Sequence, residues 1–242
     1  MAVKIGSARI DENKHATGGK AGDQSGVEVS TQNWYKHSKG WRVFRAKNVA
    51  IGNLIADDME YACLNPNIGY DQSQRGTLYT VSKPVLFNCK KVTKKCECDC
   101  SSLVRVCCAY AGIMLPNFRT SNEASVLLAS GYFKEMKGKQ YTDSSDYLMR
   151  GDILVTKTQG HTVIVLDNGS KVGKELNGYI LVTAKSVNVR EEPKKGTTVL
   201  GIVHKWDKLP YVGIAPNNLW YETIYNGQTA YITRKYTEFV PE

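Results

Sequence analysis

The chain has 242 residues, of which 42% are apolar, 23% charged and 10% aromatic. These fractions are typical of a globular protein with one or two domains, and they exclude a fibrous repeat or a wholly disordered chain. Lys and Arg number 32 against 23 Asp and Glu, which gives a formal net charge of +9. A basic surface attracts polyanions. Because no zinc finger, RNP motif or dense basic helix is present, nucleic acid is not the expected partner.

The termini and apolar runs bear on where the protein acts. No apolar run approaches the roughly 18–20 residues needed to cross a bilayer, so membrane insertion is not expected. Arg9, Asp11 and Glu12 interrupt the first residues before the apolar core of a signal peptide can form. We therefore expect synthesis in the cytoplasm without a secretory signal.

The first part of the chain alternates predicted strands and helices. Gly18, Gly19, Gly22 and Gly26 supply turns to a loop that lacks both the GK[ST] ending and the GxGxxG spacing of phosphate-binding loops, so a plain surface or cleft loop is favoured. Ser101 and Ser102 are expected to cap a helix that ends near Gly112. The predicted elements are strands at 5–10, 41–44, 153–155 and 161–166, the last two forming a hairpin, and helices at 47–63, 101–112 and 122–130.

The composition changes after Asn168. A polar, glycine-containing stretch leads into short strands separated by turns, with no spacing typical of a helix. We expect a first domain over residues 1–172, a linker over 173–177 and a small all-β barrel over 178–242. The predicted strands of this barrel are 179–183, 187–190, 199–204, 209–214, 220–224 and 229–233.

The cysteines are confined to one region. An odd number leaves at least one thiol free, and their clustering excludes a disulfide framework for the whole chain. This usage fits a reducing cytosol. The seven are Cys63, Cys89, Cys96, Cys98, Cys100, Cys107 and Cys108.

A zinc site is an alternative use for three of these thiols. Cys96, Cys98 and Cys100 alternate with single residues, whereas structural zinc sites prefer two to four residues between paired ligands. No Cys or His pair follows at finger spacing. We therefore expect free thiols, with no metal and no cofactor, and we place the remaining histidines at the surface: His15, His37 and His204.

One constellation is suited to nucleophilic catalysis. Asp99, Cys100, Ser101 and Ser102 begin a helix, and Gly160-His161 begins a buried strand about 60 residues later. A cysteine in the first turn of a helix lies at the positive end of the macrodipole, which favours the thiolate. A histidine held against that turn can take the thiol proton and later protonate a leaving amine.

These segments resemble a known family. DCSSLVRVCCAYAGI and RGDILVTKTQGHTVIVLDNG look like the NlpC/p60-type and CHAP-type cysteine peptidases of bacterial cell walls. The resemblance implies an α+β, papain-like fold with Cys100 as nucleophile and His161 as base. It also implies that Asp99 and Ser101 help to hold the peptide stem, and that Asp152 in the GD turn is structural.

The sequence departs from the family at the residue that orients the histidine. The family places this residue about a dozen positions after the histidine, where this chain has Val172-Gly173-Lys174 and no His, Asn or Gln. Asp167 and Asn168 lie about 20 Å from His161 if the strand is extended. A Cys–His dyad, or a third group from elsewhere in the chain, is therefore expected.

The long segment before Cys100 offers polar groups for the site. Gln24, Asp23 and Tyr70 are candidates for the oxyanion donor or the orienting group. Of these we take Gln24 and Tyr70, with Asp99 and Ser101, as the predicted substrate-binding residues. Ordinary solvated loop residues are the alternative for each loop candidate.

The last 65 residues resemble the bacterial SH3-type domain of cell-wall enzymes. The resemblance runs over VTAKSVNVREEPKKGTTVLGIVHKWDKLPYVG and LWYETIYNGQTAYITRKY, and it implies peptidoglycan binding without catalysis. Five aromatic residues offer surface for stem peptides or cross-bridges, although core packing is the commoner role of each: Tyr211, Trp220, Tyr221, Tyr225 and Tyr231.

The sequence as a whole predicts a monomeric hydrolase of the endolysin type that cleaves an amide bond of peptidoglycan. Such an enzyme acts on the wall after release from the bacterial cytoplasm, through a holin lesion if a phage encodes it. An N-acetylmuramoyl-L-alanine amidase with the same Cys–His machinery and a non-catalytic wall-binding protein are the alternatives.

Overall fold

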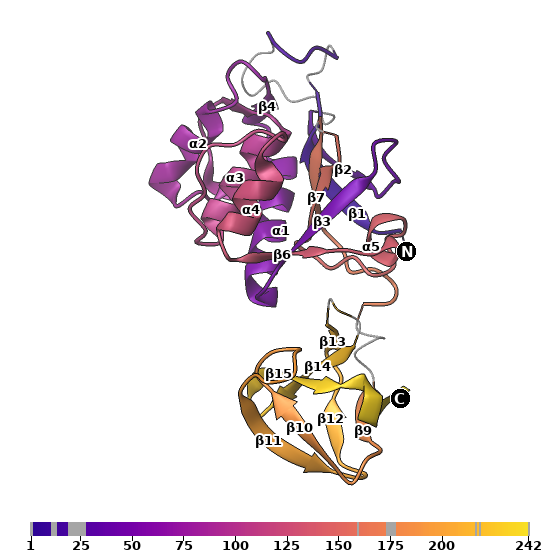
Figure 1. Ribbon diagram of the computed structural model, residues 1–242. Coiled ribbons are helices and arrows are strands. Elements are labelled where there is room, and N and C mark those ends of the chain that lie inside the picture. The colour runs from indigo at the N-terminus through magenta and orange to yellow at the C-terminus, as the bar shows by residue number, and fades with distance from the viewer. Residues whose placement is uncertain are drawn as a thin grey trace. The chain divides into compact units, whose positions relative to one another are not determined.

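The computed structural model describes residues 2–10, 14–18, 28–158, 160–172, 178–215, 217 and 219–241. The chain divides into two compact units, Met1–Ser170 and Lys171–Glu242, each with its own hydrophobic core (Figure 1). Within the described residues no helix is both long and apolar enough to traverse a bilayer.

A six-stranded antiparallel sheet forms the centre of the first unit. Its strand order is β2-β1-β8-β7-β3-β6, so the strand nearest the start of the chain lies beside the strand that follows His161. Ile5 pairs with Val165, and Ile153 pairs with Ile164. The strands are β1 (Lys4–Ala8), β2 (Val29–Asn33), β3 (Trp41–Ala46), β6 (Phe133–Met136), β7 (Ile153–Thr156) and β8 (Thr162–Val165).

The main helices gather on one face of this sheet (Figure 1). They are α1 (Val49–Leu64), α2 (Thr77–Ser82), α3 (Cys100–Tyr110) and α4 (Glu123–Ala129), and the short α5 (Lys139–Thr142) follows β6. Two 3-10 turns, Lys83–Val85 and Cys89–Lys91, and a parallel pair of short strands, β4 (Ile68–Tyr70) and β5 (Cys96–Cys98), complete the unit. The predicted α+β class is confirmed.

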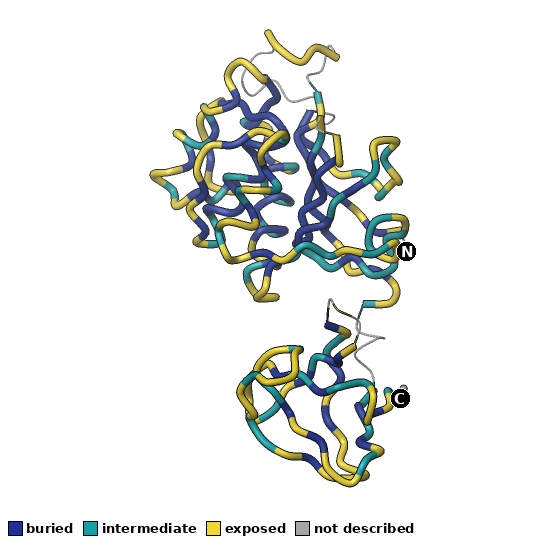
Figure 2. Tube along the Cα trace, in the orientation of Figure 1, coloured by how far each residue is buried: buried dark blue, intermediate teal, exposed yellow. Residues whose placement is uncertain are grey.

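Both faces of the sheet are buried, which explains why its central strands are almost continuously apolar (Figure 2). Alternate residues of a strand point to opposite faces. Ile153 and Ile164 face the helices and join the main core, whereas Leu154 and Val163 face a smaller cluster on the other side. Trp41, fully buried, belongs to that smaller cluster.

A close contact of two glycines joins helix α1 to the start of β7. Gly151 has a φ of +86°, and a Cβ placed there would lie 2.1 Å from the carbonyl oxygen of Gly52. Only glycine satisfies both the left-handed backbone and this approach. The GD turn therefore fixes where β7 leaves the helical layer.

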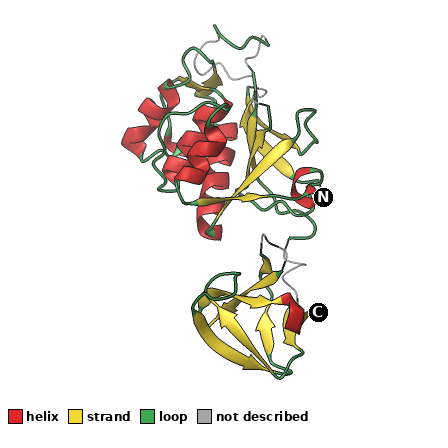
Figure 3. Ribbon diagram, viewed as in Figure 1, coloured by secondary structure: helices red, strands yellow, loops and turns green. Residues whose placement is uncertain are grey.

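The second unit is built from strands and short turns (Figure 3). A five-stranded sheet of order β11-β10-β15-β14-β13 and a three-stranded sheet of order β12-β9-β16 enclose one core that includes Ile180, Val182, Val189, Ala230 and Ile232. The strands are β9 (Gly178–Val182), β10 (Ser186–Arg190), β11 (Val199–His204), β12 (Lys208–Pro210), β13 (Gly213–Ile214), β14 (Trp220–Tyr225), β15 (Gln228–Thr233) and β16 (Thr237–Pro241), with a 3-10 turn at Arg234–Tyr236.

Candidate active site

Cys100 is the first residue of helix α3. Asp99 is the N-cap: its carboxylate accepts a hydrogen bond from the backbone N–H of Ser102 at 2.7 Å, and the hydroxyl of Ser102 accepts one from the N–H of Asp99 at 2.8 Å. This reciprocal capping box replaces the predicted caps at Ser101 and Ser102, because a cap precedes the first helical residue and Ser102 occupies the third helical position. Cys100 thereby lies in the first turn, with 8% of its surface exposed.

His161 comes immediately before strand β8 and is held through its backbone. Its N–H donates to the Oγ1 of Thr156 at 3.1 Å, and its carbonyl accepts from the N–H of Thr156 at 3.0 Å. The backbone N–H of the next residue, Thr162, lies close enough to the sulfur of Cys100 to lower the pKa of the thiol. The fold thus brings the two predicted catalytic residues, Cys100 and His161, to the same place, where helix α3 meets the start of β8.

Ser7, on strand β1, supplies a third polar group. Its Oγ lies 3.4 Å from Nε2 of His161, and it donates at 3.0 Å to the carbonyl of Thr162 or of Ala8. A hydroxyl has only one hydrogen, so when Ser7 donates it to a carbonyl, Oγ accepts from the ring and Nε2 carries the proton. In this arrangement Nδ1 is the unprotonated nitrogen.

No motif near the start of the chain predicts this group. The family pattern places the orienting residue after β8, but on the side away from β7 the neighbour of β8 is β1, from the beginning of the unit. The two nearby candidates are engaged elsewhere: Asp167 accepts from the N–H of Lys4 at 3.0 Å, and Asn168 accepts from that of Arg150 at 2.9 Å.

Burial sets the resting protonation of the pair. Burial, with the carboxylates of Asp99 and Glu123 adding to it, raises the pKa of Cys100 to about 12, although the backbone hydrogen bonds from Thr162 and Ser101 lower it. Burial also lowers the pKa of His161 to about 4, and the charges of His37 and Arg9 act in the same direction. Near pH 7 the thiol and the imidazole are therefore both neutral. The expected thiolate is disfavoured because loss of solvent outweighs the helix dipole.

Tyr70, the last residue of β4, belongs to the same neighbourhood. It is 5% exposed, and its hydroxyl accepts a hydrogen bond from Nε2 of Gln72 at 2.9 Å. Burial raises its pKa to about 12, and Cys100 and Asp99 lie close enough to contribute to that rise. The phenol thus keeps its proton and remains a donor. Gln24 and Asp23 lie outside the described residues.

Arg75, which the sequence did not indicate, fixes the residues on either side of Cys100. Its Nε donates to Asp99 at 2.5 Å, and its Nη2 donates to the hydroxyl of Ser101 at 2.8 Å. Other donors of the same guanidinium reach Asn117 at 2.9 Å and the carbonyl of Phe118 at 2.6 Å. Asp99 and Ser101 are both buried, so their side chains are rigidly oriented.

Glu123, on helix α4, contacts the first residue of strand β8. Its Oε1 accepts a hydrogen bond from Oγ1 of Thr162 at 2.8 Å, and burial raises its pKa to about 8. The carboxyl is therefore largely protonated at neutral pH. Like Arg75 and Ser7, it reaches the site through tertiary packing rather than through a recognisable motif.

The remaining thiols are all free, and most are buried. The sulfurs of Cys96 and Cys98 point at the carbonyls of Asn67 and Gly69, at 3.6 and 3.5 Å. His37, predicted at the surface, is partly buried and lines a hollow of about 460 Å³ together with His161 and Tyr35. Asp152 is fully buried and receives two hydrogen bonds from Arg45, at 2.8 and 2.7 Å, which makes it a structural residue.

Known proteins agree with this architecture. The sequence pattern of the endolysin-like domain family matches residues 5–172, and that of the bacterial SH3 domain matches residues 185–238. A crystal structure of an NlpC/P60 family protein from Bacillus cereus ATCC 10987 is 19% identical over 37% of this chain and 27% of that chain, with a TM-score of 0.23. The alignment thus spans about a quarter of that protein. The search of curated proteins found no match.

The chain therefore falls in the class of two-unit proteins that join an α+β unit to a small bacterial SH3-type unit. More particularly, it belongs to the endolysin-like domain family, whose pattern covers more than half of its residues.

Proposed function

We propose that this protein is a peptidoglycan hydrolase that cleaves an amide bond in the peptide stem or cross-bridge, with Cys100 as nucleophile and His161 as general base. The observation that supports the proposal is the packing of α3 against β8, which brings Cys100, in the first turn of the helix, near His161, at the start of the strand, with Oγ of Ser7 3.4 Å from Nε2 of the imidazole. No hydrogen bond joins the thiol to the ring in this described part of the chain. Catalytic contacts of this kind often tighten only when substrate binds.

The reaction follows general-base activation rather than a preformed ion pair. Nδ1 of His161 takes the thiol proton as the sulfur attacks the carbonyl carbon of the amide. The hydroxyl of Tyr70 and the amides of the first turn of α3 are the proposed donors to the oxyanion. Collapse of the tetrahedral intermediate breaks the C–N bond, and the imidazolium protonates the leaving amine. Water, deprotonated by His161, then hydrolyses the thioester to release a carboxylic acid and the free thiol.

Asp99 and Ser101 are proposed to contact the peptide stem, as the resemblance implies. Their common bond to Arg75 supports this role, because a binding group is most selective when its rotamer is fixed before the ligand arrives. Gln24 stays a predicted substrate-binding residue. The second unit is proposed to hold the enzyme on peptidoglycan and to take no part in the chemistry.

The test compares the full-length protein with Cys100→Ala on purified bacterial walls. We expect the variant to lose at least about 10³-fold in the rate of turbidity loss while it still sediments with the walls. Cys108→Ala is the matched control, since Cys108 is a fully buried thiol on the same helix. Clearing by Cys100→Ala at the wild-type rate would refute the mechanism, and so would an equal loss in a folded Cys108→Ala.

Mass spectrometry of the digest identifies the bond. New amino termini within the stem or cross-bridge are the expected products. Release of intact stems with a free L-Ala amino terminus would instead establish the amidase alternative, with the same catalytic residues.

A further inference from the structure

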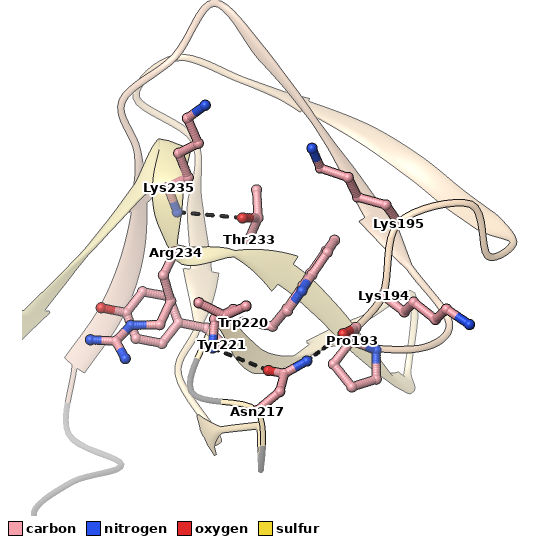
Figure 4. Close-up of a pocket in the computed structure, with 10 residues that line it drawn as sticks. Pro193, Lys194, Lys195, Asn217, Trp220, Tyr221, Thr233, Arg234 and Lys235 are labelled. Carbon is pink, nitrogen blue, oxygen red and sulfur yellow. Dashed lines mark hydrogen bonds between the residues drawn. The ribbon is translucent and has the colours of Figure 1, made fainter.

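A groove on the second unit has a composition that peptide binding does not explain. It has a volume of about 670 Å³ and runs between the turn after β10 and the base of the β14–β15 hairpin. Apolar surface from Trp220 and Pro193 lines it together with four cationic residues: Lys194, Lys195, Arg234 and Lys235. Figure 4 shows the side chain of Trp220 between those of Lys195 and Lys235.

The walls of the groove are tied to one another. Nδ2 of Asn217 donates to the carbonyl of Pro193 at 2.7 Å, and its Oδ1 accepts from the N–H of Leu219 at 3.1 Å. The N–H of Arg234 in turn donates to the carbonyl of Leu219 at 3.0 Å. Three segments far apart in the sequence are therefore fixed relative to one another, so binding costs little ordering of the backbone.

The charge of the groove is of one sign. No carboxylate lines it, and within the described residues Lys194, Lys195 and Lys235 form no ion pair. Glu191 and Glu192 belong to the same turn, but their side chains are exposed outside the groove. A concave site that collects several cations favours a ligand carrying several anionic groups.

We propose that this groove binds a phosphodiester polymer of the bacterial wall, a chain of phosphates joined by polyol or sugar units. Ammonium groups attract phosphates as point charges, and the C–H faces of a polyol or sugar suit the ring of Pro193 and the 7% of Trp220 that stays exposed in the groove. A stem peptide fits less well, because its amines offset the charge of its carboxylates, whereas a phosphodiester chain carries one negative charge in every repeat and no positive one. The inference deepens the proposed wall function: the second unit recognises the anionic polymer attached to peptidoglycan rather than the peptides themselves.

The experiment measures wall retention of the full-length chain carrying Cys100→Ala, so that the walls stay intact. Two double variants, each changing the charge by four, are compared: Lys195→Glu with Lys235→Glu in the groove, and Lys185→Glu with Lys205→Glu on exposed positions outside it. Each is mixed with untreated walls and with walls stripped of phosphodiester polymers by hydrofluoric acid. Poly(glycerol phosphate) is the soluble probe.

We expect the groove pair to weaken binding to untreated walls at least about 10-fold and the control pair less than about 3-fold, with binding falling steeply as salt is added. Stripping the walls should weaken binding of the parent protein as much as the groove substitutions do. On stripped walls the parent and the groove pair should therefore bind equally. Poly(glycerol phosphate) should compete for the parent protein alone.

Three results would overturn the inference. Undiminished binding of the parent to stripped walls would exclude the polymer as ligand. A groove pair that binds stripped walls less well than its parent would assign the groove to peptide or glycan. An equal loss of wall binding in the groove pair and the control pair would mean that only the net charge of the protein matters. The Cys100 chemistry is checked separately, by measuring hydrolysis of soluble muropeptides with a chain that keeps Cys100 and carries the groove pair. Wall binding and hydrolysis are independent measurements, so the failure of one proposal is distinguishable from the failure of the other.

Discussion

Ser7 lies where a single hydroxyl can orient a histidine: its Oγ is 3.4 Å from Nε2 of His161 and 3.0 Å from two backbone carbonyls. When the hydroxyl hydrogen is donated to a carbonyl, the oxygen accepts from Nε2–H, and Nδ1 is the unprotonated nitrogen that the proposed mechanism needs. In that mechanism Ser7 acts through the histidine, as a positioning residue.

Replacing Ser7 with alanine should lower kcat/KM on soluble muropeptides roughly fivefold, the effect of losing one net hydrogen bond. A structural defect alone would not change the tautomer, so ¹⁵N NMR of the imidazole provides the decisive readout. We expect mostly Nε2–H in the parent and a mixture of tautomers in Ser7→Ala. Ser30→Ala, opposite Ser7 on β2 and also buried, is the control that should leave the spectrum unchanged. A spectrum of Ser7→Ala identical to that of the parent would remove the positioning role.

At the scale of the elements, sequence patterns predicted helices, strands and a hairpin formed by neighbouring residues, but not how distant elements pair. The helices that became α1, α3 and α4, the strands β1 and β3, and the β7–β8 hairpin followed from apolar spacing and turn residues, and they are confirmed. The neighbour of β8 did not follow, because sheet order depends on contacts between residues more than 150 positions apart. The same holds for Arg75 and Glu123, whose partners come from other elements. Three-residue strands such as β4 and β5 were missed since they are too short to show alternation.

The contact between α1 and β7 gives a prediction about elements. Gly151→Ala should lower the free energy of unfolding, because a left-handed residue gains a Cβ that must displace the backbone of Gly52. Gly131 is the matched control: its φ is +76°, but a Cβ there meets no atom within 4 Å. We expect a cost of about 1 kcal/mol for Gly131→Ala and at least about 2 kcal/mol more for Gly151→Ala, measured by urea unfolding. Equal costs would show that α1 can move away from the turn.

For the molecule as a whole, the distribution of charge matters more than the net value of +9. From Gly178 onward the chain has eight basic and six acidic residues, and four of these cations line one groove. The first unit instead buries ionisable groups in its core: seven thiols are free, and burial raises the pKa of Asp58 to about 7 and that of Glu123 to about 8. One unit thus collects exposed cations in a groove, while the other buries thiols and carboxyls in their neutral form.

The shifted pKa values of these buried groups predict how the stability of the first unit depends on pH. Asp58 and Glu123 keep their protons in the folded state, whereas the unfolded chain releases them above about pH 4. Their contribution to the free energy of unfolding is therefore complete below about pH 4 and is lost as the pH rises through 7 to 8. His161 acts oppositely, because its folded pKa of about 4 lies below the unfolded value. Its contribution is complete above pH 6.5 and is lost as pH falls toward 4. Two raised carboxyls outweigh one lowered imidazole, so stability should decline from pH 5 to pH 8.

Urea unfolding of the full chain at pH 5, 6.5 and 8 measures this slope. Asp58→Asn with Glu123→Gln should flatten it, since neither amide titrates, although both variants lower stability at pH 5 by disturbing buried hydrogen bonds. Glu191→Gln, an exposed position in the second unit, should leave the slope as it is. A slope unchanged in the double variant would mean that these carboxyls do not hold their protons in the fold. A slope that flattens would establish them as buried neutral acids. Thr162, which donates a hydrogen bond to Glu123, would then contact a protonated carboxyl at the pH where His161 is proposed to act as a base.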